Sequence, residues 1–198
     1  MDDRLVKYLS LYRATASDDA PALEREVWDA YGVERAVLSL DMSGFSRLTE
    51  RHGILHFLAM IQHMREVTRP LVEAAGGEVV KFEADNMFAV AATVDQALDA
   101  ALGIVSGSKE ANRSLDEPSR IHVCLGIDFG RLLLIPGAEL FGAPVNFACK
   151  LGEDMAGRGE ILITDEAFGR LAGACPHPAR PARFTIGGLE VAARIIRP

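Results

Sequence analysis

Short apolar strands alternate with longer helical stretches from residue 33 onward, and this order limits the possible folds most strongly. Residues 36–40 (AVLSL) are a continuous apolar run, which is typical of a buried strand. A helical stretch is expected over 46–75, with breaks at Gly53 and Pro70, and Gly76-Gly77 ends it. Next come strands at 78–84 and 87–92, a helix from 93 to about 112, strands at 121–127 and 132–135, a helix at 144–155 and a strand at 160–163. The order βααββαβ predicts an α+β fold with a ferredoxin-like core.

Both ends of the chain add to this core. A short helix after Thr164 and two strands near Phe184 and Val191 predict a C-terminal α/β extension. Residues 2–31 have the apolar spacing of one or two amphipathic helices, the second opening at Pro21 and stopping at Gly32. We therefore expect an N-terminal helical arm over residues 1–32 and a folded domain over residues 33–198.

The chain of 198 residues carries a formal net charge of −7, with a pI of about 5.3. Nucleic-acid binding requires an excess of Lys and Arg, so nucleic acid is not an expected partner. The three cysteines lack CxxC spacing, which favours reduced thiols in a cytoplasmic setting. The apolar runs are too short to cross a bilayer, so we expect a soluble protein without membrane insertion.

Asp41 is the first residue that suggests chemistry. It ends the apolar run at 36–40, and reactive groups in α/β folds commonly stand at the ends of strands. The alternative is that Asp41 or Ser43 only caps the helix that follows.

The hairpin at residues 78–92 carries a second acidic residue, Asp85. Side chains alternate between the two faces of a strand, so the pattern places three charges on one face and three apolar side chains on the other. The charged set is Lys81, Glu83 and Asp85, and the apolar set is Val80, Phe82 and Ala84. The alternative is a solvated face with an ordinary Asp85-Asn86 turn. If Asp41 and Asp85 are adjacent, however, they offer the oxygen ligands that hard cations such as Mg²⁺ require.

Several separated blocks of the sequence resemble one known family. Residues 36–45 (AVLSLDMSGF), 76–81 (GGEVVK) with Asp85, and 140–150 (LFGAPVNFACK) followed by 159–164 (GEILIT) are similar, in order and spacing, to class III adenylate and guanylate cyclases. The resemblance extends over residues 33–197. It implies a class III cyclase-like fold and a nucleotide cyclase that converts ATP to 3′,5′-cyclic AMP and pyrophosphate in cyclic-nucleotide signalling.

The resemblance also implies the residues of an active site. Asp41, Asp85 and the Met42 carbonyl would hold two divalent cations, Mg²⁺ or Mn²⁺. Asn146 would orient the ribose, and Lys150 would stabilise the developing charge on the phosphoryl group. Each site would combine the metal-binding residues of one chain with the other residues of a second chain, so the family implies a homodimer.

Lys81 and Glu139 would read the base. A lysine donor and a carboxylate acceptor match adenine, which offers a ring-nitrogen acceptor and an exocyclic amino donor. Guanine would present a carbonyl and a ring N–H to the same pair, so ATP is the expected substrate.

The phosphate-binding part of the sequence departs from the family pattern. Lys150 and Cys124 stand where the family commonly has arginine, and Gly187 aligns with a common triphosphate lysine. Arg131 is the candidate replacement. These departures leave a second functional hypothesis open: a weak or inactive cyclase homologue that acts as a nucleotide-binding or protein-interaction module.

Overall fold

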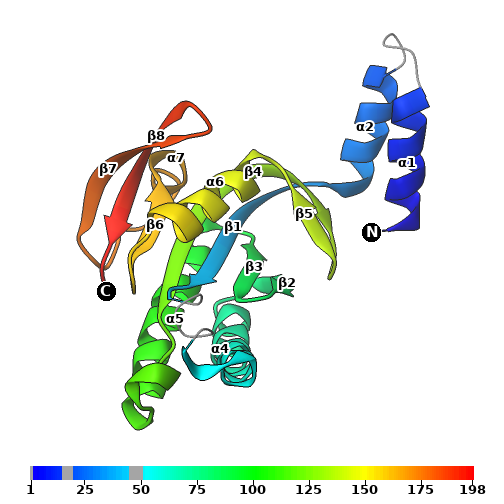
Figure 1. Ribbon diagram of the computed structural model, residues 1–198. Helices are drawn as coiled ribbons and strands as arrows, with labels where there is room; N and C mark the ends of the chain where they lie inside the picture. The colour runs from blue at the N-terminus through cyan, green and yellow to red at the C-terminus, as the bar shows by residue number, and fades with distance from the viewer. Residues whose placement is uncertain (1, 15–19, 45–50) are drawn as a thin grey trace.

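The computed structural model describes residues 2–14, 20–44 and 51–198. In these residues, eight strands form one mixed sheet in the order β2-β3-β1-β4-β6-β8-β7, with β5 paired to β4 (Figure 1). The strands are β1 (Gly32–Met42), β2 (Glu78–Glu83), β3 (Asn86–Ala91), β4 (Val123–Ile135), β5 (Glu139–Phe141), β6 (Ile161–Thr164), β7 (Ala179–Ile186) and β8 (Leu189–Ile196). The helices are α1 (Asp3–Ala14), α2 (Ala20–Tyr31), α4 (Ile54–Ala74), α5 (Val94–Ala111), α6 (Ala143–Lys150) and α7 (Asp165–Phe168), with short turns η1 (Asn112–Ser114), η2 (Glu117–Ser119) and η3 (Leu151–Met155). The predicted α+β architecture is confirmed.

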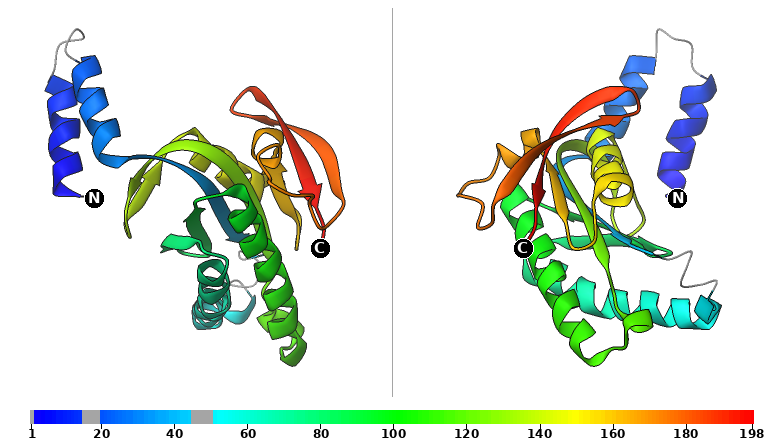
Figure 2. Two further views of the ribbon diagram at one scale, coloured as in Figure 1. Left: turned by 180° about the vertical axis from the view of Figure 1, so that it is seen from behind. Right: turned by 60° about the vertical axis from the view of Figure 1, so that its left-hand side comes forward.

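Helices cover both faces of the sheet (Figure 2). On one face, α4 and α5 pack on alternate β1 side chains such as Leu38 and Leu40 in the largest core cluster. On the other face, α6 packs through Val145 and Ala148 against Val37 of β1. The alternation of β1 side chains between two apolar layers explains why this strand reads as a continuous apolar run.

In its described part, the helical stretch expected at 46–75 is broken at Gly53, as predicted, and is then continuous from Ile54 to Ala74. Residues 45–50 lie outside the described residues, and α4 begins after Gly53, whose φ is +83°. The break predicted at Pro70 is wrong, because Pro70 lies inside α4. Met64 and Val72 are buried on either side of it, and their packing against the core compensates for the hydrogen bond that proline removes.

The two strands expected at 121–127 and 132–135 are a single strand, β4. It pairs antiparallel with β1 from Met42↔Val123 to Gly32↔Leu133. This continuous pairing carries the strand through Asp128 and Gly130, which are weak strand formers by sequence. Strand β5 was not expected; it follows a turn at Pro136-Gly137 and pairs with the end of β4.

The β2–β3 hairpin differs from the prediction by one residue in its turn. Glu83 pairs with Asn86, so the turn is Ala84-Asp85, and Ala84 has a φ of +50°. The register also shifts between Val79 and Lys81, which is the mark of a β-bulge.

The bulge changes the predicted faces of β2. Val80 packs with Val37 and Phe88, whereas Phe82 packs against the opposite core cluster, so these two residues do not share a face. Lys81 lies 5.2 Å from the ring centroid of Phe88, on the same side as Val80.

The N-terminal helices form a hairpin that projects from the sheet (Figure 1). Leu5 is buried in it, and the Tyr31 hydroxyl donates a hydrogen bond to Asp2. The Arg131 guanidinium stacks 4.3 Å above the Trp28 ring and so joins β4 to α2. The division at residue 32 into an arm and a domain stays a prediction. Among the described helices, none is long and apolar enough to cross a membrane.

Candidate active site

Asp41 and Asp85 lie near one another where β1 ends and the β2–β3 hairpin turns. Asp41 is half-buried, and its Cα pairs with that of Cys124 on β4. The Asn86 amide, oriented with its nitrogen toward β1, donates to Asp41 Oδ1 at 2.9 Å. Burial raises the pKa of Asp41 to about 7, and the negative charges of Asp85 and Glu153 add to this increase. The pKa of Asp85 is also raised, by burial.

The two carboxylates predicted to be adjacent are therefore brought together. The capping alternative for Asp41 and Ser43 concerns a helix start in residues 45–50, which are outside the described residues. The Met42 N–H donates to the Asp41 carboxylate, and the Met42 side chain is buried. A role for the Met42 carbonyl stays a prediction.

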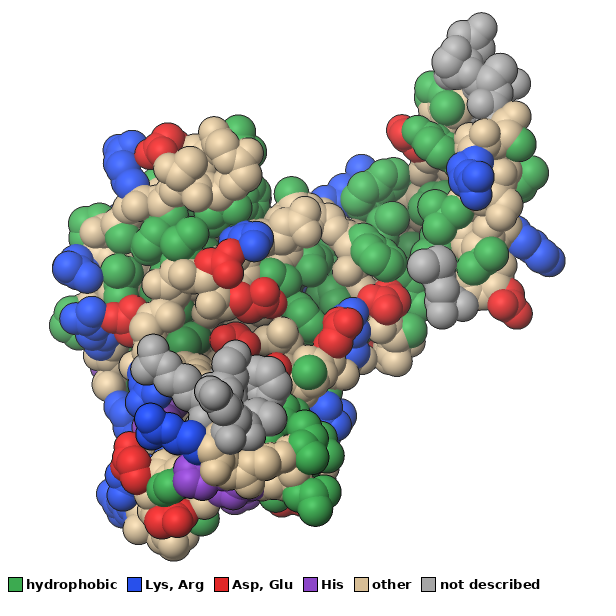
Figure 3. All heavy atoms as spheres, viewed as in Figure 1, with side chains coloured by type: hydrophobic (Ala, Val, Ile, Leu, Met, Phe, Trp, Pro, Cys, Tyr) green, Lys and Arg blue, Asp and Glu red, His purple; other side chains and the backbone are tan. Residues whose placement is uncertain are grey.

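Carboxylates of η3 and of the β2–β3 hairpin lie near one another, among the red side chains in the middle of Figure 3. Burial is the main cause of the raised pKa of Asp41, and the repulsion between these carboxylates adds to it. No group of three or more His, Cys, Asp or Glu side chains in the described residues is arranged to hold a metal by itself. Two carboxylates with like-charged neighbours are a donor set that suits hard cations whose other ligands come from phosphate or water. The residues present therefore fit divalent metal ions.

Lys81 and Glu139 are also brought together, from β2 and β5. The Lys81 Nζ atom donates to Glu139 Oε2 at 2.9 Å and lies 2.9 Å from Glu83 Oε2. Burial lowers the pKa of Lys81, but its bonds to the two glutamates outweigh burial, so the net pKa is raised. Lys81 is therefore a charged donor held between two acceptors.

Asn146 and Lys150 lie one turn apart on the exposed side of α6. The Lys150 Nζ atom donates to Asp154 Oδ2 at 2.7 Å, and this bond raises the pKa of Lys150. Asp154 belongs to η3, which is a single π-helical turn that directly continues α6. Such turns are frequent at functional sites.

The close approach of α6 to the sheet depends on Gly126. A Cβ at Gly126 would lie 2.0 Å from the Ala148 carbonyl oxygen and 2.6 Å from the Gly152 nitrogen. The glycine therefore lets the backbone of α6 and η3 rest directly on β4.

Two of the residues that depart from the family pattern for phosphate binding, Cys124 and Gly187, lie on β4 and in the β7–β8 turn. Cys124 is buried beside Asp41; burial and the Asp41 charge raise the pKa of its thiol to about 11, so it is a neutral group. Gly187 lies in the tight turn between β7 and β8. Arg131, the candidate replacement, is the strand-register partner of Glu34, seven residues along β1 from Asp41 of the same chain, and stacks on Trp28; its role toward the phosphates stays a prediction.

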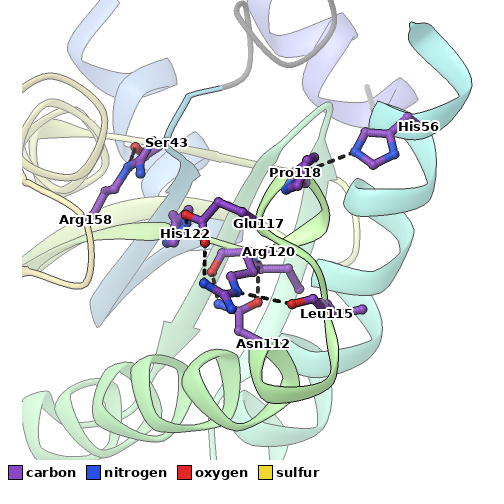
Figure 4. Close-up of polar contacts among 10 residues, drawn as sticks. Ser43, His56, Asn112, Leu115, Glu117, Pro118, Arg120, His122 and Arg158 are labelled. Atoms are coloured by element: carbon purple, nitrogen blue, oxygen red, sulfur yellow. Dashed lines mark hydrogen bonds and ion pairs between the residues drawn. The ribbon is translucent and has the colours of Figure 1, made fainter. Parts of the chain in front are cut away.

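Arg158 and Glu153 lie at this site and were not singled out from the sequence. The Arg158 Nε atom donates to Ser43 Oγ at 3.0 Å, directly after β1 (Figure 4). Only the two glycines around Arg158 hinted at a special turn, and sequence alone did not show that residues 43 and 158 meet. Glu153 contributes through its charge on Asp41.

The known proteins to which this chain is similar are adenylate and guanylate cyclases. No protein-family model matches the chain. Putative adenylate cyclase 3 of Rhizobium meliloti (strain 1021) is 30% identical over 130 residues, which are 66% of this chain and 22% of that protein. The chain thus spans about a fifth of the length of this curated relative.

Solved structures are similar over most of the chain. An adenylate/guanylate cyclase/hydrolase from Silicibacter pomeroyi has a TM-score of 0.74 and 27% identity, covering 84% of this chain and 98% of that one. The guanylate cyclase domain of RhGC from Catenaria anguillulae, in complex with GTP, has a TM-score of 0.70 and 18% identity, covering 82% of this chain and 95% of that one.

The resemblance read from the sequence is confirmed: the chain has the fold of class III adenylate and guanylate cyclase catalytic domains and is related to them.

Proposed function

We propose that the chain is a nucleotide cyclase that converts ATP to 3′,5′-cyclic AMP and pyrophosphate. The observation that carries this proposal is the meeting of Asp41 and Asp85 at the end of β1, where neither carboxylate forms an ion pair with a basic side chain of the described residues. Two adjacent carboxylates of this kind suit a divalent cation. A nucleoside triphosphate is a substrate that binds together with such a cation.

In this reaction the ribose 3′-oxygen attacks the α-phosphorus. The O3′–Pα bond forms, the bond from Pα to the β-phosphate oxygen breaks, the hydroxyl proton passes to solvent and pyrophosphate leaves. Divalent cations bound by Asp41, Asp85 and the Met42 carbonyl would supply charge neutralisation at the phosphates. Asn146 would orient the ribose, and Lys150 would stabilise charge that develops on the phosphoryl oxygens. Positioning and electrostatics are the main sources of catalysis in phosphoryl transfer.

The Lys81–Glu139 pair supports adenine as the base. Lys81 Nζ donates and Glu139 accepts, and the two atoms already lie 2.9 Å apart in the order that an adenine edge requires. The ring nitrogen would accept from Lys81, and the exocyclic amino group would donate to Glu139. Binding of the base would replace the direct ion pair with two hydrogen bonds to the ligand.

We propose that two chains share each site, with Asp41 and Asp85 from one and Lys81, Glu139, Asn146 and Lys150 from the other. The exposed position of Asn146 and Lys150 on α6 supports this arrangement, because both side chains are accessible to a second protomer.

The proposal is tested by measuring cyclic AMP formation with Mg²⁺ and with Mn²⁺ in the wild-type protein and in Asp41→Ala. We expect metal-dependent product in the wild type and a loss of at least about 100-fold in the variant. The matched control is Asp99→Ala on the solvent side of α5, which should retain full activity. Equal background product in the wild type and Asp41→Ala would refute the catalytic proposal.

A second candidate function rests on Cys124 and Lys150. The neutral thiol beside Asp41 and the ion pair that holds Lys150 on Asp154 reduce the positive charge available to phosphates. The chain would then be an inactive homologue that binds nucleotide or a partner chain. Nucleotide binding without product, in the same assay, would favour this function.

A further inference from the structure

Arg158 occupies a tight turn that is fastened to the sheet. The Glu160 N–H donates to the Gly157 carbonyl at 2.9 Å, which closes the turn. Gly159 takes a φ of +71°, and its N–H donates to the Val123 carbonyl of β4 at 2.7 Å. The backbone of Arg158 is therefore fixed relative to the start of β4.

The Arg158 side chain crosses to the end of β1. Its Nε atom donates to Ser43 Oγ at 3.0 Å, and Ser43 is itself held by a 2.9 Å hydrogen bond from its N–H to the His122 carbonyl (Figure 4). The Nη2 atom lies against Gly44, only 3.1 Å from the place that a Cβ would take. This contact aims the guanidinium at the backbone that follows Asp41 and Met42.

The Arg158 guanidinium lies at the end of the sheet that carries Asp41. Ser43, which accepts from Arg158, follows Asp41 by two residues and is bonded to His122 just before β4. Cys124 on β4 is the cross-strand partner of Asp41. The positive charge of Arg158 is therefore positioned beside the end of β1.

Arg158 also differs from the other cations of the site. Lys81 is bound to Glu139 and Glu83, and Lys150 is bound to Asp154. Over the described ranges, 2–14, 20–44 and 51–198, no carboxylate lies within ion-pair distance of the Arg158 guanidinium. With Nε used by Ser43, neither terminal nitrogen has a hydrogen-bond partner among the described residues, so both can donate to an anion.

We infer that Arg158 binds the terminal phosphates of the nucleotide and supplies the positive charge that Cys124 lacks. This inference rests on the proposed function, because the β- and γ-phosphates of ATP are the anion it assigns to the site. A guanidinium offers two parallel donors that match phosphate oxygens, and Ser43 fixes its orientation. The cationic side chain that binds the phosphates therefore comes from the turn before β6. The family commonly has it on β4, at the position of Cys124.

Binding of 3′-deoxy-ATP in the presence of Mn²⁺ tests the inference, because this analogue lacks the attacking hydroxyl and is not turned over. Calorimetry would compare the wild type, Arg158→Gln and Arg158→Lys, each also with 3′-deoxy-AMP. We expect Arg158→Gln to weaken 3′-deoxy-ATP binding by roughly 10-fold to 100-fold and Arg158→Lys by less, since lysine keeps the charge but loses the fork. Binding of 3′-deoxy-AMP, which lacks the terminal phosphates, should change less than about twofold.

The matched control is Arg180→Gln, which removes the same charge from an exposed position on the edge strand β7 and should bind 3′-deoxy-ATP like the wild type. If the wild type and Arg158→Gln bind 3′-deoxy-ATP equally, the inference fails while the proposed function stands. Equal weakening of the triphosphate and the monophosphate would also overturn it. If the wild type binds neither analogue, the proposed function fails as well.

Discussion

The two lysines of the site are each engaged by carboxylates, and this arrangement sets what substitutions at them should do. Lys81 lies 2.9 Å from both Glu139 and Glu83, and Lys150 lies 2.7 Å from Asp154. A ligand must compete with these partners, so the selectivity of the site depends on pairs of residues. Substitutions should therefore be made with the partners in view.

Exchanging the base-reading pair should shift the preferred substrate from ATP to GTP. In Lys81→Glu/Glu139→Cys, the new carboxylate accepts from the guanine ring N–H and the thiol donates to its carbonyl. Glu83→Gln is added because a carboxylate at position 81 would otherwise face Glu83 at close range. We expect the ratio of kcat/KM for ATP to that for GTP to fall by roughly 100-fold. Steady-state kinetics with both nucleotides measures this ratio, Glu83→Gln alone is the control, and an unchanged ratio would remove Lys81 and Glu139 from base recognition.

Lys150→Arg should increase kcat. Arginine restores a planar, bidentate donor for the phosphoryl oxygens while keeping the charge. The expected gain is roughly threefold to tenfold at saturating ATP and Mn²⁺, with little change in KM, because the interaction forms in the transition state. Lys150→Met should lose most activity. A loss of activity in Lys150→Arg as large as in Lys150→Met would show that position 150 does not act on the phosphoryl group.

A buried carboxyl away from the site should make stability depend on pH. Burial raises the pKa of Asp128 from 3.8 to about 6, although the Thr164 hydroxyl donates to Oδ1 at 2.5 Å. Between pH 4 and 6 the unfolded chain loses this proton while the folded chain keeps it, so the contribution of Asp128 to stability falls as the pH rises and is fully lost above pH 6. Relative to Asp128→Asn, the wild type should lose about 1–3 kcal/mol of unfolding free energy over this range. Urea unfolding of both proteins at pH 4.5, 6 and 7.5 measures the difference, and parallel pH profiles would contradict the expectation.

At the scale of elements, α6 and its π-helical continuation depend on the absence of a side chain at Gly126. Gly126→Ala would place a Cβ 2.0 Å from the Ala148 carbonyl oxygen, so α6 must move outward. We expect a loss of about 3 kcal/mol in unfolding free energy. Because Asn146 and Lys150 move with the helix, kcat should fall while Mn²⁺ binding at Asp41 and Asp85 persists. Thermal unfolding, cyclic AMP assays and Mn²⁺ titration would separate these effects, and Gly173→Ala, where a Cβ meets no atom within 4 Å, is the control.

The sequence predicted most elements because local signals marked their ends. Thr93 and Gln96 form a capping box at the start of the helix predicted from residue 93, and Gly76-Gly77 follows the end of α4. The errors arose where tertiary pairing overrides local preference: β4 runs through Asp128 and Gly130 because it pairs with β1 continuously from Val123 to Leu133. The bulge in β2 was equally invisible, since it depends on the register with β3.

The candidate site was predictable only where residues share an element or a family block. The meeting of Asp41 with Asp85 and the contact between Lys81 and Glu139 both followed from the resemblance. The contact between Ser43 and Arg158 joins two loops 115 residues apart, which no local pattern reveals.

At the scale of the whole molecule, shared sites predict complementation between inactive variants. Asp41→Ala lacks a metal ligand and Asn146→Ala lacks the ribose contact, so each homodimer should be inactive. When the two are mixed and exchange subunits, half of the dimers are mixed, and each of these holds one intact site. Activity should recover to about a quarter of the wild-type value per chain. Mixing before the cyclic AMP assay, with sedimentation to confirm the dimer, tests this; no recovery in a confirmed mixed dimer would place each site within one chain.

The continuity of α2 with β1 couples the position of the N-terminal helices to the position of β1. Helix α2 ends at Tyr31, and β1 begins at the very next residue, Gly32, and runs without interruption to Met42. No loop separates the projecting helices from β1, so a rotation of these helices is transmitted directly to the strand. The junction is Gly32, which packs against Trp28. A partner that binds α1 and α2 would therefore displace β1, the strand that carries Asp41 at its opposite end.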